Sequence, residues 1–202
     1  MAKLFCFFGL PAAGKSTIIN QLYNVNGDCL LFLPRYTSRP ARPTEIGRPI
    51  PDYCFIDPRW FKALKTNGCF FATEDFHSYS YGIRSSDINL ILSNCLPGVI
   101  MPGYCIVDLK KSFPKQVETI FITVPGIDLA KSIFLPEGKK ILSNRMKERG
   151  DDEASIEARL DLASQIIEKD RLHLLADHIV IKDDQEGEES ALLAVQRIVG
   201  LV

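Results

Sequence analysis

The stretch that most constrains the fold of this 202-residue chain is FCFFGLPAAGKST, at Phe5–Thr17, where an apolar run leads into glycines, a lysine and two hydroxyls. Residues Gly9–Ser16 match the pattern G-x-x-x-x-G-K-[ST] of a phosphate-binding loop. In such a loop the backbone N–H groups surround phosphates, the lysine contacts the terminal ones, and the hydroxyl is a ligand of Mg²⁺. The sequence therefore predicts that Lys15 binds phosphate and that Ser16 binds the metal.

The residues around this loop also fit a strand followed by a helix. Lys3–Phe8 has the continuous apolar character of a buried parallel strand, and Ser16–Tyr23 has helical spacing, so the helix N-terminus would face a bound anion. A secretion signal is the alternative, because Lys3 precedes an apolar segment that ends in small residues. However, the apolar run stops at Leu10, before a proline, and the helical pattern after it suits a mature domain. We therefore favour the phosphate loop.

Composition sets the outer bounds. With 46% hydrophobic and 24% charged residues, the chain can bury a full core and suggests one domain. A net charge of −1 gives no reason to expect nucleic acid or an anionic membrane as a partner, and no apolar stretch approaches the length of a membrane span. The six cysteines include no C-x-x-C pair, which favours reduced thiols in a cytoplasmic protein. The three histidines have no ligand-like spacing, so they are expected to be ordinary surface or core residues.

Strand-like and helix-like segments alternate along the chain without repeats, which predicts an α/β fold with a parallel sheet and helices on both faces. In such sheets ligands bind at the carboxyl ends of the strands, where the phosphate loop would lie. Further strands are expected at Cys29–Leu33, Tyr53–Ile56, Cys69–Thr73, Gly98–Met101, Thr119–Val124 and His178–Lys182. Helices are expected at Pro58–Thr66, with Asp57 as N-cap, and at Ser86–Asn94, Cys105–Ser112, Ser155–Lys169 and Glu188–Val199.

Two regions interrupt this alternation with arginine-rich sequence. One is PRYTSRPARPTEIGRPIPDYCFI, which contains Arg35, Arg39, Arg42 and Arg48, and the other is NRMKERGDDEASIEARL, which contains Arg145, Arg149 and Arg159. A run of arginines is usually a solvated face. Here prolines and aromatic residues accompany the first cluster, and a phosphate loop lies in the same small domain, so we favour anion binding.

Four motifs, GLPAAGKST, TSRPARPTEIGRPIPDYCFI, YSYGI and RMKERGDDEASIEARL, together resemble the guanylate kinase family in order and spacing, over nearly the whole chain. The resemblance implies a P-loop NTPase three-layer sandwich with an acceptor-binding insertion and a lid. It implies one domain over residues 1–202, with a core at 1–33 and 95–202, an acceptor-binding region at about 34–84 and a lid at about 130–158. It further implies an ATP-dependent kinase that uses Mg²⁺, as a monomer or homodimer.

Site residues follow from the resemblance position by position. The ATP-binding loop would comprise Gly9, Leu10, Pro11, Ala12, Ala13, Gly14, Lys15, Ser16 and Thr17, with Ser16 on the metal. Arg39, Arg42, Tyr53 and Tyr81 match positions that hold the acceptor's phosphate, while Arg145, Arg149 and Arg159 match a lid that closes over the triphosphate. Catalysis is then expected from Lys15, Arg39 and the three lid arginines. Transfer between two phosphates needs positioning and charge neutralisation more than a catalytic base, which suits these residue types.

The chain departs from the family where the acceptor's base would be read. Arg35 replaces a serine that contacts guanine, Ala72 stands at a glutamate position with Glu74 two residues away, and Val99–Gly103 lacks an acidic pair. Unpaired guanine donors would cost about 1–3 kcal/mol for each buried group. We therefore include Arg35 and Glu74 among the acceptor-binding residues, with Glu74 as a possible replacement for the missing glutamate.

These departures leave two acceptors open. GMP is the leading one, because the resemblance extends through the acceptor loop. Ribose 1,5-bisphosphate is the alternative, because the segment Arg35–Ala41 and Gly103 are similar to a sister group, the ribose 1,5-bisphosphate phosphokinases. A non-catalytic phosphopeptide-binding module is less favoured, since such modules typically lose the phosphate loop, and a GTP-hydrolysing switch would need an N-K-x-D motif that the sequence lacks. Residues Ala130–Leu142 form a longer segment than the family's, which can be a lid elaboration, an oligomer contact or a surface insertion.

Overall fold

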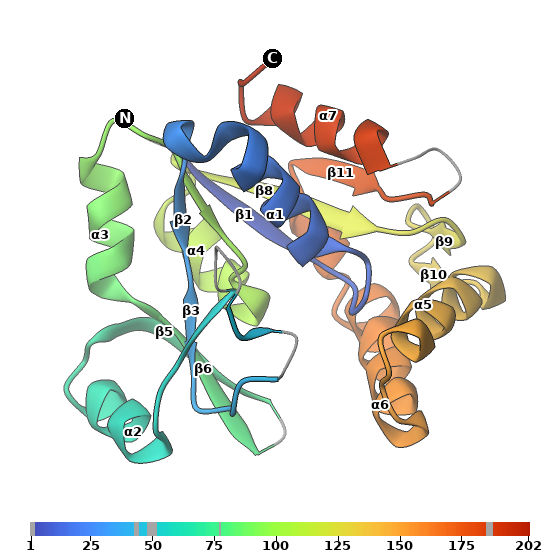
Figure 1. Ribbon diagram of the computed structural model, residues 1–202, viewed down its shortest axis with the longest axis horizontal. Helices are drawn as coiled ribbons and strands as arrows, with labels where there is room; N and C mark the ends of the chain where they lie inside the picture. Colours follow the sequence, from blue (N-terminus) through green and yellow to red (C-terminus); the bar gives the residue numbers. More distant parts are fainter. Residues whose placement is uncertain (1–2, 43–44, 48–51, 77, 185–187) are drawn as a thin grey trace. The chain divides into compact units, whose positions relative to one another are not determined.

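A computed structural model describes residues 3–42, 45–47, 52–76, 78–184 and 188–202 (Figure 1). Arg48 of the first arginine-rich region and His77, one of the three histidines, lie outside the described residues. The chain divides into two compact units: the first comprises residues 1–7 and 23–118, and the second comprises residues 8–22 and 119–202.

The larger sheet has five strands in the order β11-β8-β1-β7-β2. Its members are β1 (Leu4–Gly9), β2 (Leu31–Leu33), β7 (Gly98–Ile100), β8 (Val117–Thr123) and β11 (His178–Ile181). The pairs β1–β7, β2–β7 and β8–β11 are parallel. A continuous apolar run is typical of parallel strands that are covered on both faces, and the first five residues of β1 are all buried.

In the first unit, a second sheet has the order β4-β3-β6-β5 and mixes parallel with antiparallel pairs. Its strands are β3 (Arg35–Thr37), β4 (Tyr53–Phe55), β5 (Phe70–Phe76) and β6 (Tyr79–Arg84). The helices α2 (Pro58–Thr66) and α3 (Ser85–Ser93) pack on this sheet, as Figure 1 shows. The stacked rings of Phe61 and Phe70, 4.6 Å apart, join α2 to it.

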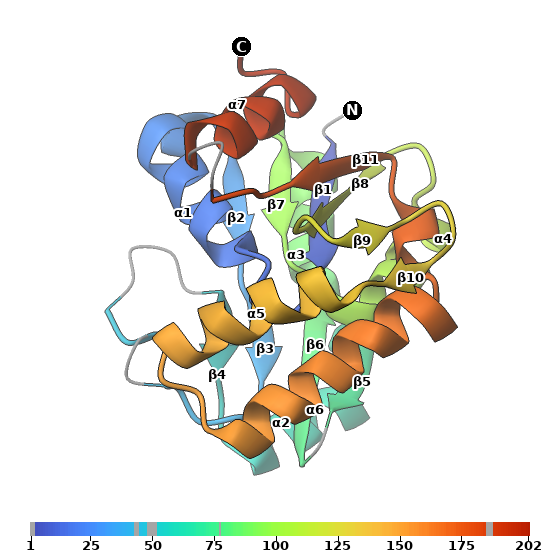
Figure 2. The ribbon, with the colours of Figure 1, turned by 90° about the vertical axis from the view of Figure 1, so that its right-hand side faces the viewer.

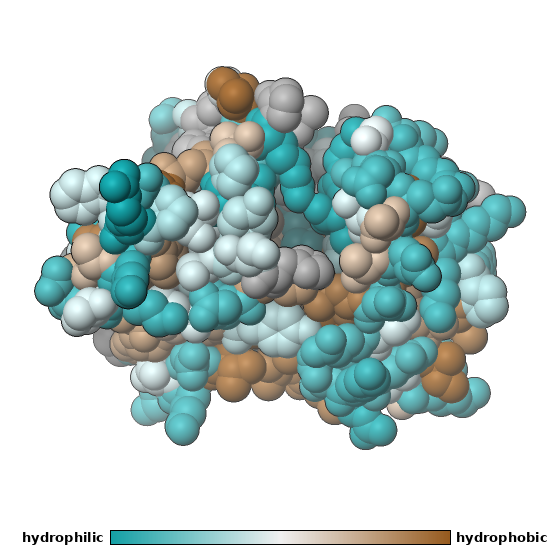
Figure 3. Space-filling view, turned by 90° about the horizontal axis from the view of Figure 1, so that it is seen from below, coloured by the Kyte–Doolittle hydropathy of each residue, from teal (hydrophilic) through white to brown (hydrophobic). Residues whose placement is uncertain are grey.

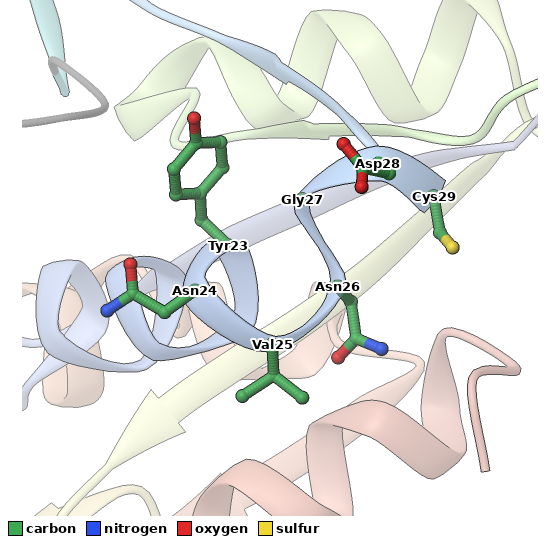
Figure 4. Close-up of a pocket in the computed structure, with 7 residues that line it drawn as sticks. All are labelled: Tyr23, Asn24, Val25, Asn26, Gly27, Asp28 and Cys29. Carbon is green, nitrogen blue, oxygen red and sulfur yellow. The ribbon is translucent and has the colours of Figure 1, made fainter.

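The first unit also contains two short 3₁₀ helices, at Gly27–Cys29 and Gly103–Cys105, and the helix α4 (Ile106–Ser112). The helix α1 (Lys15–Asn26) begins in the second unit and ends in the first. Figure 4 shows the last turn of α1 and the 3₁₀ turn after it, where a pocket is lined by residues 23–29. This pocket lies at the far end of α1 from the phosphate loop, and a single carboxylate, Asp28, is its only charged lining group.

The second unit contains the hairpin β9 (Ile127–Asp128) and β10 (Ile133–Phe134), followed by α5 (Pro136–Glu148) and α6 (Glu153–Ser164). Figure 2 shows α5 and α6 side by side. A π-helical turn at Gln165–Lys169, a 3₁₀ helix at Leu172–Leu175 and α7 (Glu188–Ile198), which packs on β11, complete this unit.

Two glycines fix where α5 begins. The backbone N–H of Leu135 donates to the carbonyl oxygen of Gly126 at 3.2 Å. A Cβ at Gly126 would lie 2.3 Å from the backbone nitrogen of Gly138, and a Cβ at Gly138 would lie 2.6 Å from the carbonyl oxygen of Gly126. The turn after β8 and the first turn of α5 are therefore in direct backbone contact.

Several predicted elements are confirmed with shifted ends. The helix Pro58–Thr66 is found with the predicted bounds, and the Asp57 side chain caps it by accepting from the N–H of Arg59 at 2.8 Å. The strand predicted from Cys29 starts at Leu31, because Gly27–Cys29 forms a 3₁₀ turn. The helix predicted from Cys105 starts at Ile106, because Gly103–Cys105 forms another 3₁₀ turn.

Other expectations need correction. The helix predicted over 155–169 begins at Glu153, where Asp152 caps it, and its last turn is π-helical. The strands predicted at 53–56 and 69–73 belong to the second, mixed sheet instead of the parallel one. No strand or helix was predicted for the segment Ala130–Leu142, which holds β10 and the first half of α5.

The described helices include none with the length and apolar composition of a membrane span. Figure 3 shows hydrophilic residues interspersed with hydrophobic ones on the face that it draws.

Candidate active site

The phosphate loop lies between β1 and α1 in the second unit and depends on glycine at its first position. Gly9 has φ +135°, and a Cβ there would lie 2.1 Å from the carbonyl oxygen of Ile122 in β8. Strand packing and backbone conformation therefore both require glycine. Leu10 and Ala13 are fully buried and anchor the loop, and the N–H of Ile18 donates to the carbonyl of Gly14 at 3.0 Å to start the helix.

Lys15 is the first residue of α1, with Ser16 and Thr17 after it in the first turn. Its ammonium donates to the carbonyl oxygens of Gly9 at 3.1 Å and Leu10 at 2.7 Å. The lysine thus lies over the loop that the sequence assigns to phosphates. The N-terminus of this twelve-residue helix adds backbone N–H groups and a partial positive charge, which favour an anion.

Arg145, near the end of α5, contacts the phosphate loop. Its guanidinium donates to the carbonyl oxygens of Ala12 at 3.3 Å and Lys182 at 3.1 Å, and it pairs with the carboxylate of Asp184 at 2.8 Å. The predicted lid arginine is therefore held against the predicted phosphate site by contacts within the second unit.

The other two lid arginines share a different partner. Arg149, which follows α5, pairs with the carboxylate of Asp151, and the guanidinium of Arg159 in α6 lies 3.8 Å from the same carboxylate. Asp151 thereby ties the end of α5 to α6. The structure groups Arg149 with Arg159, and places Arg145 separately at the loop.

A cluster of arginines and tyrosines lies in the second sheet of the first unit. Arg35 opens β3 with 5% of its surface exposed, and its guanidinium lies 4.7 Å from the ring centre of Tyr81 and 5.9 Å from that of Tyr53. Arg35 donates to Glu74 at 2.8 Å, and the second oxygen of Glu74 accepts from the backbone N–H of Cys105 at 3.1 Å. Both oxygens of Glu74 are therefore engaged.

Gly103 makes room for this ion pair. It has φ +61°, and a Cβ at this position would lie 1.9 Å from Nη1 of Arg35 and 2.6 Å from Oε1 of Glu74. The three departures noted in the sequence, Arg35, Glu74 and Gly103, thus fit one another in space. Burial, with the nearby Glu74 charge, raises the pKa of the Cys105 thiol to about 12, so this thiol stays protonated and inert.

Arg39 and Arg42 share a carboxylate that sequence reasoning did not single out. Arg39 makes a two-bond fork to Glu45, with distances of 3.0 and 2.8 Å, and the backbone N–H of Arg42 donates to Glu45 at 2.8 Å. Burial opposes ionisation of Glu45, but the hydrogen bonds from both arginines outweigh it and lower the pKa of Glu45. The Arg39 guanidinium also lies 5.3 Å from the ring centre of Tyr53.

Tyr53 and Tyr81 are neighbours, with ring centres 5.8 Å apart. Burial raises the pKa of Tyr53 despite the neighbouring Arg35 and Arg39, so its hydroxyl is a proton donor at neutral pH. The structure therefore brings together the predicted acceptor residues: Arg35, Arg39, Arg42, Tyr53, Glu74 and Tyr81.

Glu45, Lys182 and Asp184 were missed. Glu45 stands three residues after Arg42, a spacing that could have flagged it, and Lys182 and Asp184 follow β11 at the carboxyl end of a parallel strand, where ligand-binding groups gather. Among the described residues, no three His, Cys, Asp or Glu side chains form a cluster that could hold a metal ion.

The fold and the loop place the chain in the P-loop class of three-layer α/β proteins, with a mostly parallel sheet flanked by helices. No family model matches the sequence. It is similar to the guanylate kinases of Methylobacillus flagellatus, with 25% identity over 96% of this chain and 88% of that one, and of Schizosaccharomyces pombe, with 25% identity over 93% and 87%. The guanylate kinase of Sus scrofa is 24% identical over 91% and 86%.

Among solved structures, the crystal structure of guanylate kinase from Anaplasma phagocytophilum covers 98% of this chain and 84% of its own, with a TM-score of 0.68 and 18% identity. This likeness confirms the expected fold class. The relatives match nearly the whole chain, which confirms the resemblance to the guanylate kinase family that the four motifs indicated.

Proposed function

We propose that the protein is a kinase that transfers the γ-phosphate of ATP to the phosphate of GMP, giving GDP and ADP. The observation that carries the proposal is the complete phosphate loop, with Lys15 over it and Arg145 against it. Whole-length similarity to proteins named guanylate kinase supports GMP as the acceptor.

In this proposal the second unit binds the donor. Backbone N–H groups of Gly9–Thr17 and the N-terminus of α1 surround the phosphates, and Lys15 leaves its loop carbonyls to contact them. The Ser16 hydroxyl fits Mg²⁺, because this ion is typically held by few protein ligands together with phosphate and water oxygens. When bound, the ion would neutralise charge on the phosphates and help to orient them.

The first unit binds the acceptor. Arg39, Arg42, Tyr53 and Tyr81 are assigned to its phosphate. The fork from Arg39 to Glu45 fixes the plane of the guanidinium, so little side-chain entropy remains to be lost when the phosphate binds. The protonated Tyr53 hydroxyl supplies a neutral donor between two arginines.

Catalysis then consists of positioning and charge neutralisation. The acceptor oxygen is already ionised and attacks the γ-phosphorus as the bond to ADP breaks, while Lys15, Arg39 and Arg145 stabilise negative charge on the transferred group. Arg149 and Arg159 are assigned to closure of α5 and α6 over the triphosphate, which would exclude water that otherwise hydrolyses ATP. No residue is required to act as a general base.

Glu74 is the candidate that reads the base. Its carboxylate is already bonded to Arg35 and to the N–H of Cys105, so a guanine would have to share or displace these donors. The proposal therefore predicts a weaker preference for guanine over adenine than a free carboxylate would give.

A coupled ADP-release assay tests the proposal, with Mg-ATP and a panel of GMP, dGMP, AMP, UMP, CMP and ribose 1,5-bisphosphate. GMP is expected to give the highest kcat/KM. Highest turnover of the base-free sugar bisphosphate would contradict GMP as acceptor, and the absence of turnover with every compound would contradict a kinase. Lys15→Ala, measured in parallel, controls for contaminating kinases.

We further propose a cytoplasmic location, without nucleic-acid or membrane partners. All six cysteines are free, and Cys29 and Cys95 are exposed, which suits a reducing compartment. The proposal includes a monomer or a homodimer, which light scattering during size-exclusion chromatography would distinguish.

A further inference from the structure

A second lysine lies against the phosphate loop. Lys182 follows the last residue of β11, and only 6% of it is exposed. A Cβ on Gly14 would lie 2.5 Å from Cδ of Lys182 and 3.8 Å from its Nζ. The lysine stem therefore packs directly on the second glycine of the loop, and its ammonium lies beside the loop as well.

The groups around this lysine are charged. Its ammonium lies 3.3 Å from Asp184, and the guanidinium of Arg145 pairs with the same carboxylate at 2.8 Å. Arg145 also donates to the carbonyl oxygens of Lys182 and of Ala12 in the loop. Burial opposes ionisation of Asp184, but Arg145 and then Lys182 outweigh it and lower its pKa, so Asp184 is an anion beside the loop.

This arrangement fits a polyanion better than a simple ion pair. The carboxylate of Asp184 serves two cations, Lys182 and Arg145, and has 59% of its side chain exposed. Lys15 adds a third cation over the same loop. A phosphate chain carries several negative charges, so it fits a loop against which Lys15, Lys182 and Arg145 all lie.

We propose that Lys182 is a second lysine of the donor site and contacts the phosphate chain of the bound nucleotide, with Asp184 as a competing carboxylate that the phosphates displace from Lys182 and Arg145. This inference rests on the proposed function for the identity of the ligand. It adds Lys182 to the phosphate loop as a binding residue, and gives Asp184 an opposing effect on affinity.

The test is calorimetric binding of inorganic tripolyphosphate, which has phosphates but no base, alongside ATP. Lys182→Met keeps most of the apolar stem and removes the charge. Both ligands should bind at least about tenfold more weakly to it, while Lys182→Arg should bind within about threefold of the parent. Lys131→Met is the matched control, because Lys131 also lies near an aspartate, Asp128 at 3.5 Å, in the β9–β10 hairpin.

Asp184→Asn separates binding from a structural role. If Asp184 competes with the phosphates, this variant should bind tripolyphosphate more tightly, by about threefold or more. If the Lys182–Asp184 pair is only structural, removing either side chain should lower the melting temperature, and the two variants should not change the affinity for tripolyphosphate in opposite directions. Equal weakening by both variants therefore overturns the proposal.

The remaining outcomes are also decisive. Weakened ATP binding with unchanged tripolyphosphate binding would assign Lys182 to the base and overturn the proposal. Should Lys182→Met fail to fold, Lys182→Gln and Asp184→Asn carry the test. Lys15→Ala separates a failure of the donor site from a failure of the role of Lys182. If Lys15→Ala leaves tripolyphosphate binding intact, the proposed donor site itself is refuted. If Lys15→Ala weakens tripolyphosphate binding but Lys182→Met does not, only the role of Lys182 is refuted.

Discussion

Arg35 and Glu74 form an ion pair at 2.8 Å, with 6% and 19% of their side chains exposed, and the arginine lies over the ring of Tyr81. The pair joins the first residue of β3 to the middle of β5, although these two strands are not neighbours in the sheet. Because Glu74 also accepts from the backbone N–H of Cys105, one carboxylate links the second sheet to the 3₁₀ turn at Gly103–Cys105.

Breaking this pair from one side should be costly. Glu74→Ala leaves a buried guanidinium without its carboxylate, so we expect the free energy of unfolding to fall by about 3 kcal/mol in urea titrations. Asp75→Ala on the same strand is the control: its pair with Lys65, at 3.6 Å, is exposed, and the loss should be at most about 1 kcal/mol. The double variant Arg35→Met with Glu74→Met should recover much of the loss, whereas additive losses would show that the two side chains act independently.

Lys15→Ala should abolish turnover and leave the melting temperature unchanged. The Lys15 ammonium is bonded to carbonyl oxygens of its own loop, which water can replace in the variant. We expect kcat/KM for ADP release to fall by at least about a hundredfold, the size expected from losing one preorganised charge at a phosphoryl group. Retained turnover would remove Lys15 from the catalytic residues.

Arg39→Ala should also abolish turnover, but with a loss of stability, because Glu45 is left as a buried carboxylate without its fork. Arg39→Lys keeps the charge and loses the two-bond geometry, and we expect it to fold while kcat/KM falls at least about tenfold. Melting curves recorded beside the kinetics separate the two effects. An Arg39→Lys enzyme with full activity would show that the fork does not hold the acceptor.

Stability should depend on His173 at mildly acidic pH. This histidine is 4% exposed, its ring meets Phe121, and its Nε2 lies 3.3 Å from the hydroxyl of Ser132. Burial, with a smaller contribution from Arg171, lowers the pKa of His173 below its ordinary 6.5. The unfolded chain then takes up a proton at higher pH than the folded one, so this contribution to stability is complete above pH 6.5 and is lost as the pH falls below it.

Melting temperatures of the parent and of His173→Gln, recorded from about pH 8 to pH 5, check this prediction. The parent should lose stability more steeply below pH 6.5 than the variant does. Parallel curves would mean that His173 titrates alike in the folded and unfolded chains.

Gly9 should tolerate alanine far less well than Gly68. A Cβ at Gly9 meets a carbonyl of β8 at 2.1 Å, whereas nothing lies within 4 Å of a Cβ at Gly68, which has φ +65°. We expect Gly68→Ala to cost about 1 kcal/mol for its left-handed backbone, and Gly9→Ala to cost at least about 3 kcal/mol or prevent folding. Urea titrations of both variants measure these losses in the free energy of unfolding. Equal losses for the two variants would contradict the close approach of β1 and β8.

Sequence reasoning succeeded where the signals are local. The Asp57-Pro58 pair predicts the start of α2, and the motif at Gly9–Ser16 predicts the strand, loop and helix around it. It missed β3, because a three-residue strand inside a proline-rich segment is defined by its partners β4 and β6, which are distant in sequence. It also missed α5, although Pro136 marks its first turn.

The same distinction applies to the site. The phosphate loop could be predicted as a unit because its ligands are consecutive backbone groups. Lys182 and Asp184 could not be assigned, because their relation to Gly14 and Arg145 depends on how β11 packs beside β8. The sequence marked Arg35 and Glu74 as unusual, but their direct pairing requires the three-dimensional arrangement of β3 and β5.

The backbone contact between Gly126 and Gly138 has a consequence for sequence variation. Each glycine occupies the space where the other's side chain would be, so neither position can accept a larger residue while its partner keeps the present backbone path. In a library of all single substitutions, we expect no residue other than glycine to be tolerated at either position. This holds although neither glycine takes part in the contacts found at the phosphate loop. Arg145 contacts the phosphate loop from α5, the helix whose first turn packs against Gly126. A substitution at either glycine should therefore appear first as lost nucleotide affinity in a folded protein.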